Sequence, residues 1–583
     1  MTAPVTDDAD WRRSVSATGL LREFNAAGVL DASDVLVATR ITDLAGESDE
    51  RVALAIAFVV RAVRAGSVCL DLTGVQKQVA DESLPWPPPE QWLATVKDSV
   101  LAKDPSVLHL DDSLLYLDRY WIEECRVAAD VLALTAAPRS GAKVDIDRLF
   151  SGSYAEQRGA AQVALSRALT VLTGGPGTGK TTTVARLLAL LAEQAELDGR
   201  ARLRIALAAP TGKAAARLLE AVRLEVGKLE TADQERLSAV SATTLHRLLG
   251  SRPDTSSRFR HNRDNRLPHD VIVVDETSMV SLTMMARLLE AVRPDSRLLL
   301  VGDPDQLASV EAGAVLADLV EGLTAATPAG DSPIARLLTP HRFGESIGEL
   351  AAAIRDGRAD EALAVLDGGG EHIEWVQTEK PAAVLRTILV PHALALREAA
   401  VLGDGPAALA TLEEHRLLCA HRRGPYGIAY WNRQVERWLA EQTDTPLWAS
   451  WYAGRPVLVT ANDYGLGLYN GDTGVAVLRD GALRAVMSGS TGPLEFATSR
   501  LADIETMHAM TIHKSQGSQA MEVTVLLPAE DSRLLTRELL YTAVTRARER
   551  VRVIGSADQV RAAIQRRAVR ASGLSRRLRV RGG

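Results

Sequence analysis

Residues 174–181, GGPGTGKT, decide the fold of this chain, because they fit the phosphate-binding pattern G-x-x-x-x-G-K-[ST]. The apolar run ALTVLT (168–173) precedes them, and TTTVARLLALLAEQ (181–194), with apolar residues at helical spacing, follows. The loop is therefore predicted to join a buried strand to the N-terminus of a helix. Free N–H groups and the helix dipole favour a bound phosphate at such a position.

This loop contains each group that a nucleoside triphosphate requires. Its glycines let backbone N–H groups surround the phosphates, and Lys180 brings a compact positive charge to the β- and γ-phosphates. The Thr181 hydroxyl is expected to hold Mg²⁺. The predicted nucleotide-binding residues are Gly174, Gly175, Pro176, Gly177, Thr178, Gly179, Lys180, Thr181 and Thr182. ATP and Mg²⁺ are thus the predicted ligands.

Two further apolar runs end in side chains suited to hydrolysis. VIVVDE (271–276) predicts a buried strand followed by Asp275, which would hold Mg²⁺, and Glu276, which would polarise the attacking water. RLLLVGDPDQL (297–307) repeats this form and brings Gln306 to a turn after a strand. A glutamine there can hydrogen-bond both the γ-phosphate and the water. Together with the phosphate loop, these runs predict an ATP-hydrolysing core.

Composition limits the other possibilities. With 583 residues, of which 46% are hydrophobic and 24% charged, the chain is long enough for several ordinary globular domains. No stretch approaches the ~18 uncharged apolar residues of a membrane span, and the N-terminus has no apolar signal core. The 3 scattered cysteines favour a reducing cytoplasm over a disulfide framework or a four-cysteine metal site. Because the net charge is −7, nucleic acid would need a local basic groove.

Changes of pattern along the chain predict its domains. Residues 1–105 show helical periodicity without a nucleotide, metal or nucleic-acid motif, and 106–148 are expected to connect them to an ATPase unit at 149–335. A second α/β unit, without a P-loop of its own, spans 336–583. Within it, 453–508 carry short β-type runs between Gly, Asn and Asp turns, which predicts an inserted β domain. Elsewhere strands alternate with helices, so the sheets are expected to be parallel.

Further motifs follow in a fixed order. They are APTGKAA, VVDETSM, GDPDQL, PHRFGESIGELAAAI, GPYGIAYWN, NGDTG, HKSQGS and LYTAVTRAR. With GGPGTGKTTT, this series resembles superfamily-one DNA helicases over roughly residues 150–570, and in particular the RecD family, the alpha subunits of RecBCD-type helicase–nucleases (exodeoxyribonuclease V). The resemblance implies an α/β fold with two RecA-like P-loop NTPase domains, a small inserted SH3-like β domain and a mainly α-helical N-terminal domain. It also implies ATP-driven 5′ to 3′ translocation on single-stranded DNA and unwinding of duplex ends at double-strand breaks for recombinational repair.

The resemblance assigns roles to single residues. Gln157 is expected to read adenine, and Arg342 and Arg546 to reach the γ-phosphate from the second domain, where planar guanidinium groups suit the developing charge. Gln519 and Ala520 follow HKSQGS, where the family usually has an acid and an aromatic residue. The residues expected to contact single-stranded DNA are Thr211, Lys213, Thr244, His246, Asn432 and His513.

Three other segments carry expectations about strand separation and partners. The arginine-rich stretch 251–270 is either a solvated loop or the β-hairpin pin that splits the duplex, with its turn around Asn262–Asn265. The resemblance implies a heterotrimer with RecB-like and RecC-like subunits, in which residues 1–105 dock onto the RecC-like subunit through a surface that includes an exposed Trp86. Nuclease activity is then expected in a partner subunit. The basic segment 561–583 is either a solvated helix end or a phosphate contact.

Other classes of function remain open at this point. A nucleotide-binding scaffold subunit would clamp a nuclease complex without productive unwinding, and a stand-alone RecD-like helicase would act without these partners. A nuclease would need a clustered acid–acid–lysine metal site, which the sequence does not show. A transporter-type ATPase would need an LSGGQ-like signature after the P-loop. The set of acids, glutamine and arginines favours an active ATP-dependent DNA helicase over these alternatives.

Overall fold

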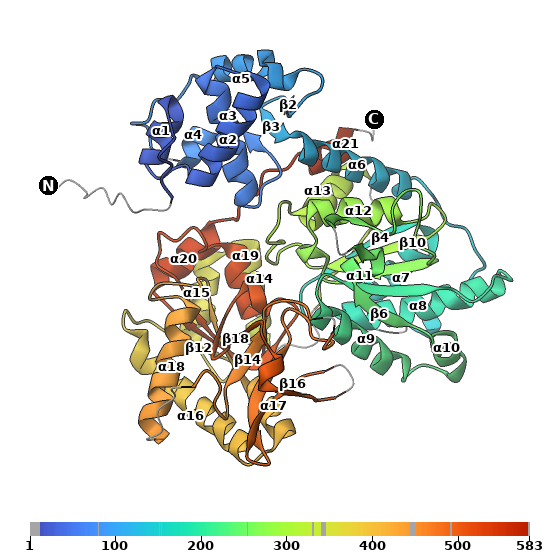
Figure 1. Cartoon of the computed structure of the whole chain (residues 1–583). Helices are drawn as coiled ribbons and strands as arrows, with labels where there is room; N and C mark the ends of the chain where they lie inside the picture. Colours follow the sequence, from blue (N-terminus) through green and yellow to red (C-terminus); the bar gives the residue numbers. More distant parts are fainter. Residues whose placement is uncertain are drawn as a thin grey trace.

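The chain folds into an N-terminal helical unit and two α/β units, the second of which carries an inserted β sheet. The computed structural model describes residues 12–79, 81–150, 152, 154–252, 255–328, 331–339, 345–443, 449–463, 465–489 and 492–580. In Figure 1 the N-terminal unit lies at the upper left, the first α/β unit at the right and the second at the lower left. Along the described part of the chain, no helix is both long enough and apolar enough to cross a membrane.

The N-terminal unit packs around one apolar helix. Its elements are α1 (Gly19–Ala26), α2 (Ala32–Ala45), α3 (Glu50–Arg64), β1 (Leu70–Asp71), α4 (Val75–Val79), α5 (Pro89–Asp98), η1 (Val100–Ala102), β2 (Leu108–Asp111) and β3 (Leu114–Leu117). In α3, residues 52–60 are all buried, so α1, α2 and α5 pack around this helix. Trp86 is only partly exposed and packs against the rings of Phe24, Phe58 and Trp92. The expectation of an exposed Trp86 is therefore wrong, because its ring completes the core of this unit.

A small antiparallel sheet, in the order β1-β3-β2, extends the N-terminal unit beyond residue 105. Leu70 of β1 lies opposite Leu115 of β3, so the segment that follows residue 105 pairs with the segment before it. The chain then continues through α6 (Asp118–Thr135) and η2 (Ile146–Arg148) into the first α/β unit.

The first α/β unit is a parallel sheet with helices on both faces. Its elements are α7 (Ala155–Ser166), β4 (Leu169–Gly174), α8 (Lys180–Leu197), β5 (Ile205–Ala209), α9 (Gly212–Val226), α10 (Thr231–Arg236), β6 (Ser241–Thr244), α11 (Leu245–Leu249), β7 (Ser251–Arg252), β8 (Thr255–Phe259), β9 (Val271–Val274), η3 (Thr277–Met279), α12 (Leu282–Ala291), β10 (Arg297–Gly302), α13 (Val315–Ala326) and β11 (Ile334–Leu337). The strand order is β11-β4-β10-β9-β5-β6. Alternate apolar residues point to opposite faces, where α7, α8 and α9 cover one side and α6, α11, α12 and α13 the other.

The second α/β unit repeats this architecture. Its elements are α14 (Glu345–Asp356), α15 (Ala359–Gly368), β12 (Ile373–Val376), α16 (Pro381–Val401), α17 (Gly405–Glu414), β13 (His415–Cys419), α18 (Ile428–Thr443), β19 (Ala509–Thr511), η5 (His513–Ser515), β20 (Ala520–Leu526), α19 (Arg537–Val544), β21 (Ala547–Ile554) and α20 (Ala557–Gln565). Its parallel strands run in the order β12-β21-β20-β13-β19. α16 and α18 cover one face, and α14, α15, α19 and α20 cover the other. The prediction of an α/β fold with parallel sheets is thus confirmed.

An antiparallel sheet, here called the β insert, interrupts the second unit between α18 and β19. Its elements are β14 (Pro456–Val459), β15 (Thr473–Arg479), β16 (Ala482–Met487), β17 (Leu494–Ala497), η4 (Thr498–Arg500) and β18 (Ile504–Thr506). The strand order is β17-β16-β15-β14-β18. The change to short β-type runs in the sequence therefore corresponds to a separate antiparallel sheet.

The C-terminal helix α21 (Leu574–Val580) returns to the first unit and packs against α13 and α6 (Figure 1). The Nε atom of Arg577 lies 2.8 Å from a carboxylate oxygen of Glu124, and its guanidinium carbon lies 4.0 Å from the centre of the Trp121 ring. Arg579 pairs with Glu321 at 2.6 Å. Because these arginines pair within the chain, the described part of the basic tail is anchored to the protein.

Candidate nucleotide and DNA site

The loop between β4 and α8 has the backbone that its glycines predict. Gly177 and Gly179 have φ angles of 82° and 85°, a left-handed conformation that glycine adopts without steric cost. A Cβ on Gly174 would lie 2.7 Å from the Leu337 carbonyl oxygen, closer than side chains approach backbone. These glycines let the loop turn from β4 into α8 while it passes close to the end of β11.

Lys180 is the first residue of α8, and its side chain folds back over the P-loop. Its Nζ donates to the carbonyl oxygens of Gly174 at 2.6 Å and of Gly175 at 2.8 Å. The Thr178 hydroxyl also donates to Gly175, at 2.9 Å, which closes the loop on itself. Thr181 follows in the first turn of α8 and is partly buried. The ammonium group is therefore held where a phosphate would meet the loop N–H groups.

Asp275 and Glu276 lie at the carboxyl end of β9, two strands away from the P-loop strand. The Glu276 N–H donates to Asp275 at 2.8 Å, and Glu276 has a left-handed φ of 50°. Burial and the Glu276 charge raise the pKa of Asp275 to about 7, whereas the Lys180 charge lowers it. A bound cation would favour the ionised acid, and carboxylate and hydroxyl oxygens are ligands that Mg²⁺ prefers, so Asp275 and Thr181 fit this ion.

The GDPDQL loop after β10 is bonded directly to the second unit. The Leu307 N–H donates to the Thr542 hydroxyl at 2.9 Å, and the Leu307 carbonyl accepts from Nε2 of Gln516 at 2.7 Å. Thr542 comes from LYTAVTRAR and Gln516 from HKSQGS. Three motifs that are far apart in sequence thus meet at one residue, and sequence reasoning had given neither Thr542 nor Gln516 a role.

Asp303 and Gln306 meet a second-unit tyrosine in the same loop. Nε2 of Gln306 and the Tyr541 hydroxyl both donate to the same Asp303 oxygen, each at 3.0 Å. Oε1 of Gln306 is buried and has no hydrogen-bond partner among the described residues. Tyr541 was also absent from the predicted site, although it lies within a quoted motif.

The structure describes one of the two arginines that are expected at the γ-phosphate. Arg546 is 4% exposed, and its Nε donates to the Thr542 carbonyl at 3.1 Å. Burial lowers its pKa, and the charges of Glu276 and Asp303 oppose that change, which places Arg546 near the acids of the first unit. Arg342 lies outside the described residues. Gln157, expected to read adenine, is buried in the first turns of α7.

A cleft of about 620 Å³ lies beside the P-loop, between the two α/β units. Gly174, Gly175, Asp303 and Gln306 line it from the first unit. The arginines along its walls are Arg336, Arg355, Arg537, Arg567 and Arg570. The acids Asp303, Asp305, Glu321 and Glu538 line it as well, whereas Lys180, Thr181, Asp275, Glu276 and Arg546 do not. This cleft therefore borders the P-loop at Gly174 and Gly175 and does not contain the whole predicted nucleotide site.

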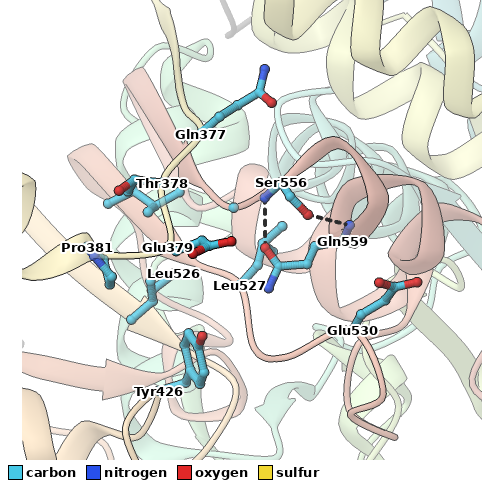
Figure 2. Close-up of a pocket in the computed structure, with 12 residues that line it drawn as sticks. Gln377, Thr378, Glu379, Pro381, Tyr426, Leu526, Leu527, Glu530, Ser556 and Gln559 are labelled. Atoms are coloured by element: carbon cyan, nitrogen blue, oxygen red, sulfur yellow. Dashed lines mark hydrogen bonds between the residues drawn. The ribbon is translucent and has the colours of Figure 1, made fainter.

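A second cavity, of about 430 Å³, lies at the carboxyl ends of β12, β20 and β21 in the second unit (Figure 2). Here Ser556 and Gln559 form a capping box at the start of α20, with bonds of 2.7 and 3.1 Å that Figure 2 shows as dashed lines. Glu379 and Glu530 line the same cavity. Their carboxylates disfavour phosphate, and the capping box occupies the helix terminus that a P-loop would use.

Several residues expected to bind DNA lie at the carboxyl edge of the first sheet. The Thr211 hydroxyl caps α9 by accepting from the Ala214 N–H at 3.2 Å, and the Thr244 hydroxyl caps α11. His246 is exposed on α11, next to the ring of Phe259. His513 is partly buried in η5 of the second unit. The two threonine hydroxyls are thus already used by the helix ends, and His246 is exposed to solvent.

Lys213 and Asn432 have partners within the protein. Nζ of Lys213 lies 3.4 Å from the Thr473 hydroxyl of the β insert. Nδ2 of Asn432 donates to the Thr506 carbonyl at 2.9 Å, and its Oδ1 accepts from the Ala509 N–H at 2.7 Å. The Asn432 carboxamide thus joins β18 to β19, and the expected DNA contact at this residue stays a prediction. Lys213 faces the β insert in this arrangement.

The segment expected to form the pin contains a short antiparallel pair, β7 with β8. Its connection falls at 253–254, outside the described residues, and not at Asn262–Asn265. Asn262 instead forms a local turn, in which its side chain accepts from the Asp264 and Asn265 N–H groups at 2.9 and 3.1 Å. The position of the hairpin turn was therefore predicted wrongly, because asparagine favours any turn, including one that follows the strands.

Ala520, one of the departures after HKSQGS, begins β20 and is 1% exposed. It lies opposite Ala547 of β21. Ala520 is therefore a buried residue beside another alanine of the neighbouring parallel strand.

Comparison with known proteins identifies the family. Family models match an AAA domain at 157–312, a UvrD-like helicase C-terminal domain at 506–554 and the N-terminal domain of RecBCD enzyme subunit RecD at 26–116. The chain is 68% identical to RecBCD enzyme subunit RecD of Mycolicibacterium smegmatis, over 97% of this chain and 100% of that protein. The chain belongs to the RecD family. It is therefore an ATP-dependent DNA helicase of the RecD type.

A second RecD relative and one solved helicase structure are also similar to this chain. RecBCD enzyme subunit RecD of Mycobacterium tuberculosis is 65% identical over 98% of each chain. Among solved structures, Bacteroides Pif1 bound to single-stranded DNA is 18% identical, with a TM-score of 0.36, and covers 68% of this chain and 91% of that one.

Proposed function

We propose that this RecD-family helicase is the helicase subunit of a RecBCD-type helicase–nuclease, assembled in the cytoplasm with RecB-like and RecC-like subunits. It moves 5′ to 3′ along single-stranded DNA and unwinds duplex ends at double-strand breaks for recombinational repair, while a partner subunit supplies nuclease activity. The names of the 65–68% identical relatives support the assembly. The two α/β units act as RecA-like domains, and the β insert as an SH3-like domain.

One observation carries the proposed mechanism: the GDPDQL loop of the first unit is hydrogen-bonded to two motifs of the second. Leu307 joins Thr542 and Gln516 beside the cleft that borders the P-loop at Gly174 and Gly175. Any opening or closing of this cleft must change the surroundings of Gln306. Hydrolysis in the cleft is thereby linked to relative motion of the two units, which is what translocation requires.

Different residues near the cleft have different roles in ATP hydrolysis. Lys180 binds the β- and γ-phosphates, and Glu276 accepts the proton of the attacking water. Arg546, together with Arg342, stabilises charge that develops on the γ-phosphate, and Gln157 reads adenine. Mg²⁺, when bound, neutralises phosphate charge, and Thr181 and Asp275 would hold it.

Single-stranded DNA crosses the carboxyl edges of both sheets. His246 and His513 contact the strand from the first and second units, and the ends of α9 and α11 at Thr211 and Thr244 offer N–H groups to its backbone. Lys213 joins them when the β insert moves away from it. The short hairpin of β7 and β8 lies beside His246, through Phe259, and acts as the pin.

A tailed-duplex assay tests this function. The purified full chain should show ATPase activity stimulated by single-stranded DNA and should unwind a 5′-tailed duplex in preference to a 3′-tailed one. Lys180→Ala, which removes the phosphate-binding ammonium with its side chain, is the control and should do neither. DNA-independent ATPase without unwinding would favour the scaffold function, and preference for the 3′-tailed duplex would overturn the polarity.

A further inference from the structure

We propose that Tyr541 is a positioning residue for ATP hydrolysis: from the second unit, its hydroxyl orients Gln306 through the carboxylate of Asp303. Tyr541 lies on α19 and is 2% exposed, whereas Asp303 and Gln306 belong to the first unit. Gln306 is therefore oriented for the attacking water only while the two units are closed on each other. The inference rests on the proposed role of Gln306 at the γ-phosphate.

A single carboxylate oxygen joins the tyrosine to the glutamine. The Tyr541 hydroxyl and Nε2 of Gln306 each donate to the same Asp303 oxygen, at 3.0 Å. A carboxylate accepts hydrogen bonds and cannot donate them, so Gln306 must present its Nε2 to Asp303. This hydrogen bond fixes the orientation of the Gln306 carboxamide, so its Oε1 points away from Asp303.

The orientation leaves Gln306 with a free acceptor at the cleft. Oε1 is buried without a hydrogen-bond partner among the described residues, and Gln306 as a whole is 5% exposed. A buried carbonyl oxygen favours any donor that reaches it. Gln306 lines the cleft that borders the P-loop together with Gly175, and a water held against the γ-phosphate would be such a donor.

Tyr541 also touches the P-loop itself. A Cβ on Gly175 would lie 3.0 Å from the Tyr541 oxygen, so the hydroxyl is packed between the P-loop and Asp303. The same turn of α19 leads to Arg546, whose Nε is bonded to the Thr542 carbonyl. α19 therefore positions both Arg546, which follows it, and Tyr541, which orients Gln306.

Docking of the two units does not depend on the tyrosine hydroxyl. Leu307 remains bonded to Thr542 and Gln516 through its own backbone. Tyr541→Phe removes one oxygen and keeps the ring, so it should leave the interface and the fold intact. This variant therefore separates orientation of Gln306 from assembly of the cleft.

Steady-state ATPase of the full chain with saturating single-stranded DNA tests the proposal. We expect Tyr541→Phe to lower kcat about 10- to 100-fold, as for a misplaced catalytic group, and to change KM for ATP by less than about twofold. Gln306→Ala should lower kcat as well. The double variant should be no slower than Gln306→Ala alone, because the tyrosine acts through the glutamine.

Two further measurements separate positioning from a structural role. Hydrogen exchange without nucleotide should speed up in Tyr541→Phe at the amides of Asp303, Asp305 and Gln306 and stay unchanged at Leu307, which keeps its bond to Thr542. Tyr452→Phe is the matched control: its hydroxyl donates to Glu436 at 3.1 Å, within the same unit and away from the cleft. It should lose stability without losing kcat.

The outcomes distinguish this inference from the proposed function. A kcat for Tyr541→Phe within about twofold of wild type, or losses that multiply in the double variant, would overturn the positioning role. Full activity of Gln306→Ala would instead refute the proposed role of Gln306. If single-stranded DNA did not stimulate the ATPase of the wild-type chain, the proposed function would be refuted. The effect of Tyr541→Phe could then still be measured on the basal ATPase rate.

Discussion

Tyr469 of the β insert lies against Gly212 at the start of α9, so closely that a Cβ on Gly212 would come within 2.3 Å of the tyrosine ring. Arg247 donates to the Tyr469 hydroxyl at 3.4 Å, and Lys213 lies 3.4 Å from Thr473 of the same insert. The β insert is therefore closed over the part of the first unit from which DNA contacts are proposed.

Replacing Tyr469 with alanine should loosen this contact and uncover Lys213. We expect the affinity for a single-stranded oligonucleotide to rise at low salt and the log–log salt slope to steepen by about 0.7, the value for one additional phosphate contact. Fluorescence anisotropy over a series of salt concentrations measures both. Tyr469→Phe keeps the ring and should match wild type. An unchanged slope in Tyr469→Ala would show that Lys213 does not contact phosphate.

Glu276→Gln should still bind ATP and DNA but hydrolyse ATP very slowly. The amide cannot take a proton from the water, and loss of a positioned general base costs about 10²–10⁴ in rate. Single-turnover hydrolysis and binding of a fluorescent ATP analogue measure the two effects separately. Because glutamine meets the same backbone strain at φ 50°, the fold should be unaffected. Near-normal turnover would assign the base to another residue.

Replacing the tip of the β7–β8 hairpin should separate duplex unwinding from translocation along single-stranded DNA. Phe259 is buried and Arg263 is bonded to Asp130 at 2.7 Å, so a replacement should spare these residues and exchange only 253–257 for a Gly/Ser turn. DNA-stimulated ATPase should persist, because the cleft is untouched, while unwinding of a 5′-tailed duplex should fall sharply. If both activities fell together, the segment would belong to the core and not to a pin.

Acid pH should weaken the second unit through His508. Burial, with the charges of His392 and Arg455, lowers its pKa to about 3. The unfolded chain takes up a proton below about pH 6.5, which the folded chain cannot accept until about pH 3, so stability should fall as pH drops through that interval. His508→Gln should make the decline of the thermal midpoint with falling pH shallower than in wild type. Parallel curves would rule out His508 as the cause.

The sequence predicts those structural features whose causes lie in neighbouring residues of the chain. The strand before Gly174, the helix after it and the acids after β9 are encoded by neighbouring residues, through apolar runs, glycine spacing and strand ends. The hydrogen bond from Leu307 to Thr542 joins residues 235 positions apart, and no local pattern specifies it. The same holds for Asn432, whose side chain joins two strands more than 70 residues away.

Removal of the N-terminal unit should release the chain from its proposed partners and leave its ATPase intact. Because β1 pairs with β3, the deletion has to include residues up to Leu117, since a cut at 105 would split the small sheet. The unit also contacts the core: the Gly313 N–H donates to the Gly66 carbonyl at 2.9 Å, and the Val68 N–H to Ala571 at 2.8 Å.

Gly313 and Ala571 adjoin Ala314 and Arg570 at one wall of the cleft, but the contacts involve neither the P-loop nor Asp275 and Glu276. DNA-stimulated ATPase should therefore persist in the truncated chain, with some loss of thermal stability where the tail loses its support. Co-purification with the RecB-like and RecC-like subunits should be lost. The full chain with Lys180→Ala is the matched control, because it lacks hydrolysis and should still assemble. Recovery of the truncated chain in the complex would place the docking surface on an α/β unit, and loss of ATPase would show that the N-terminal unit mainly supports the core.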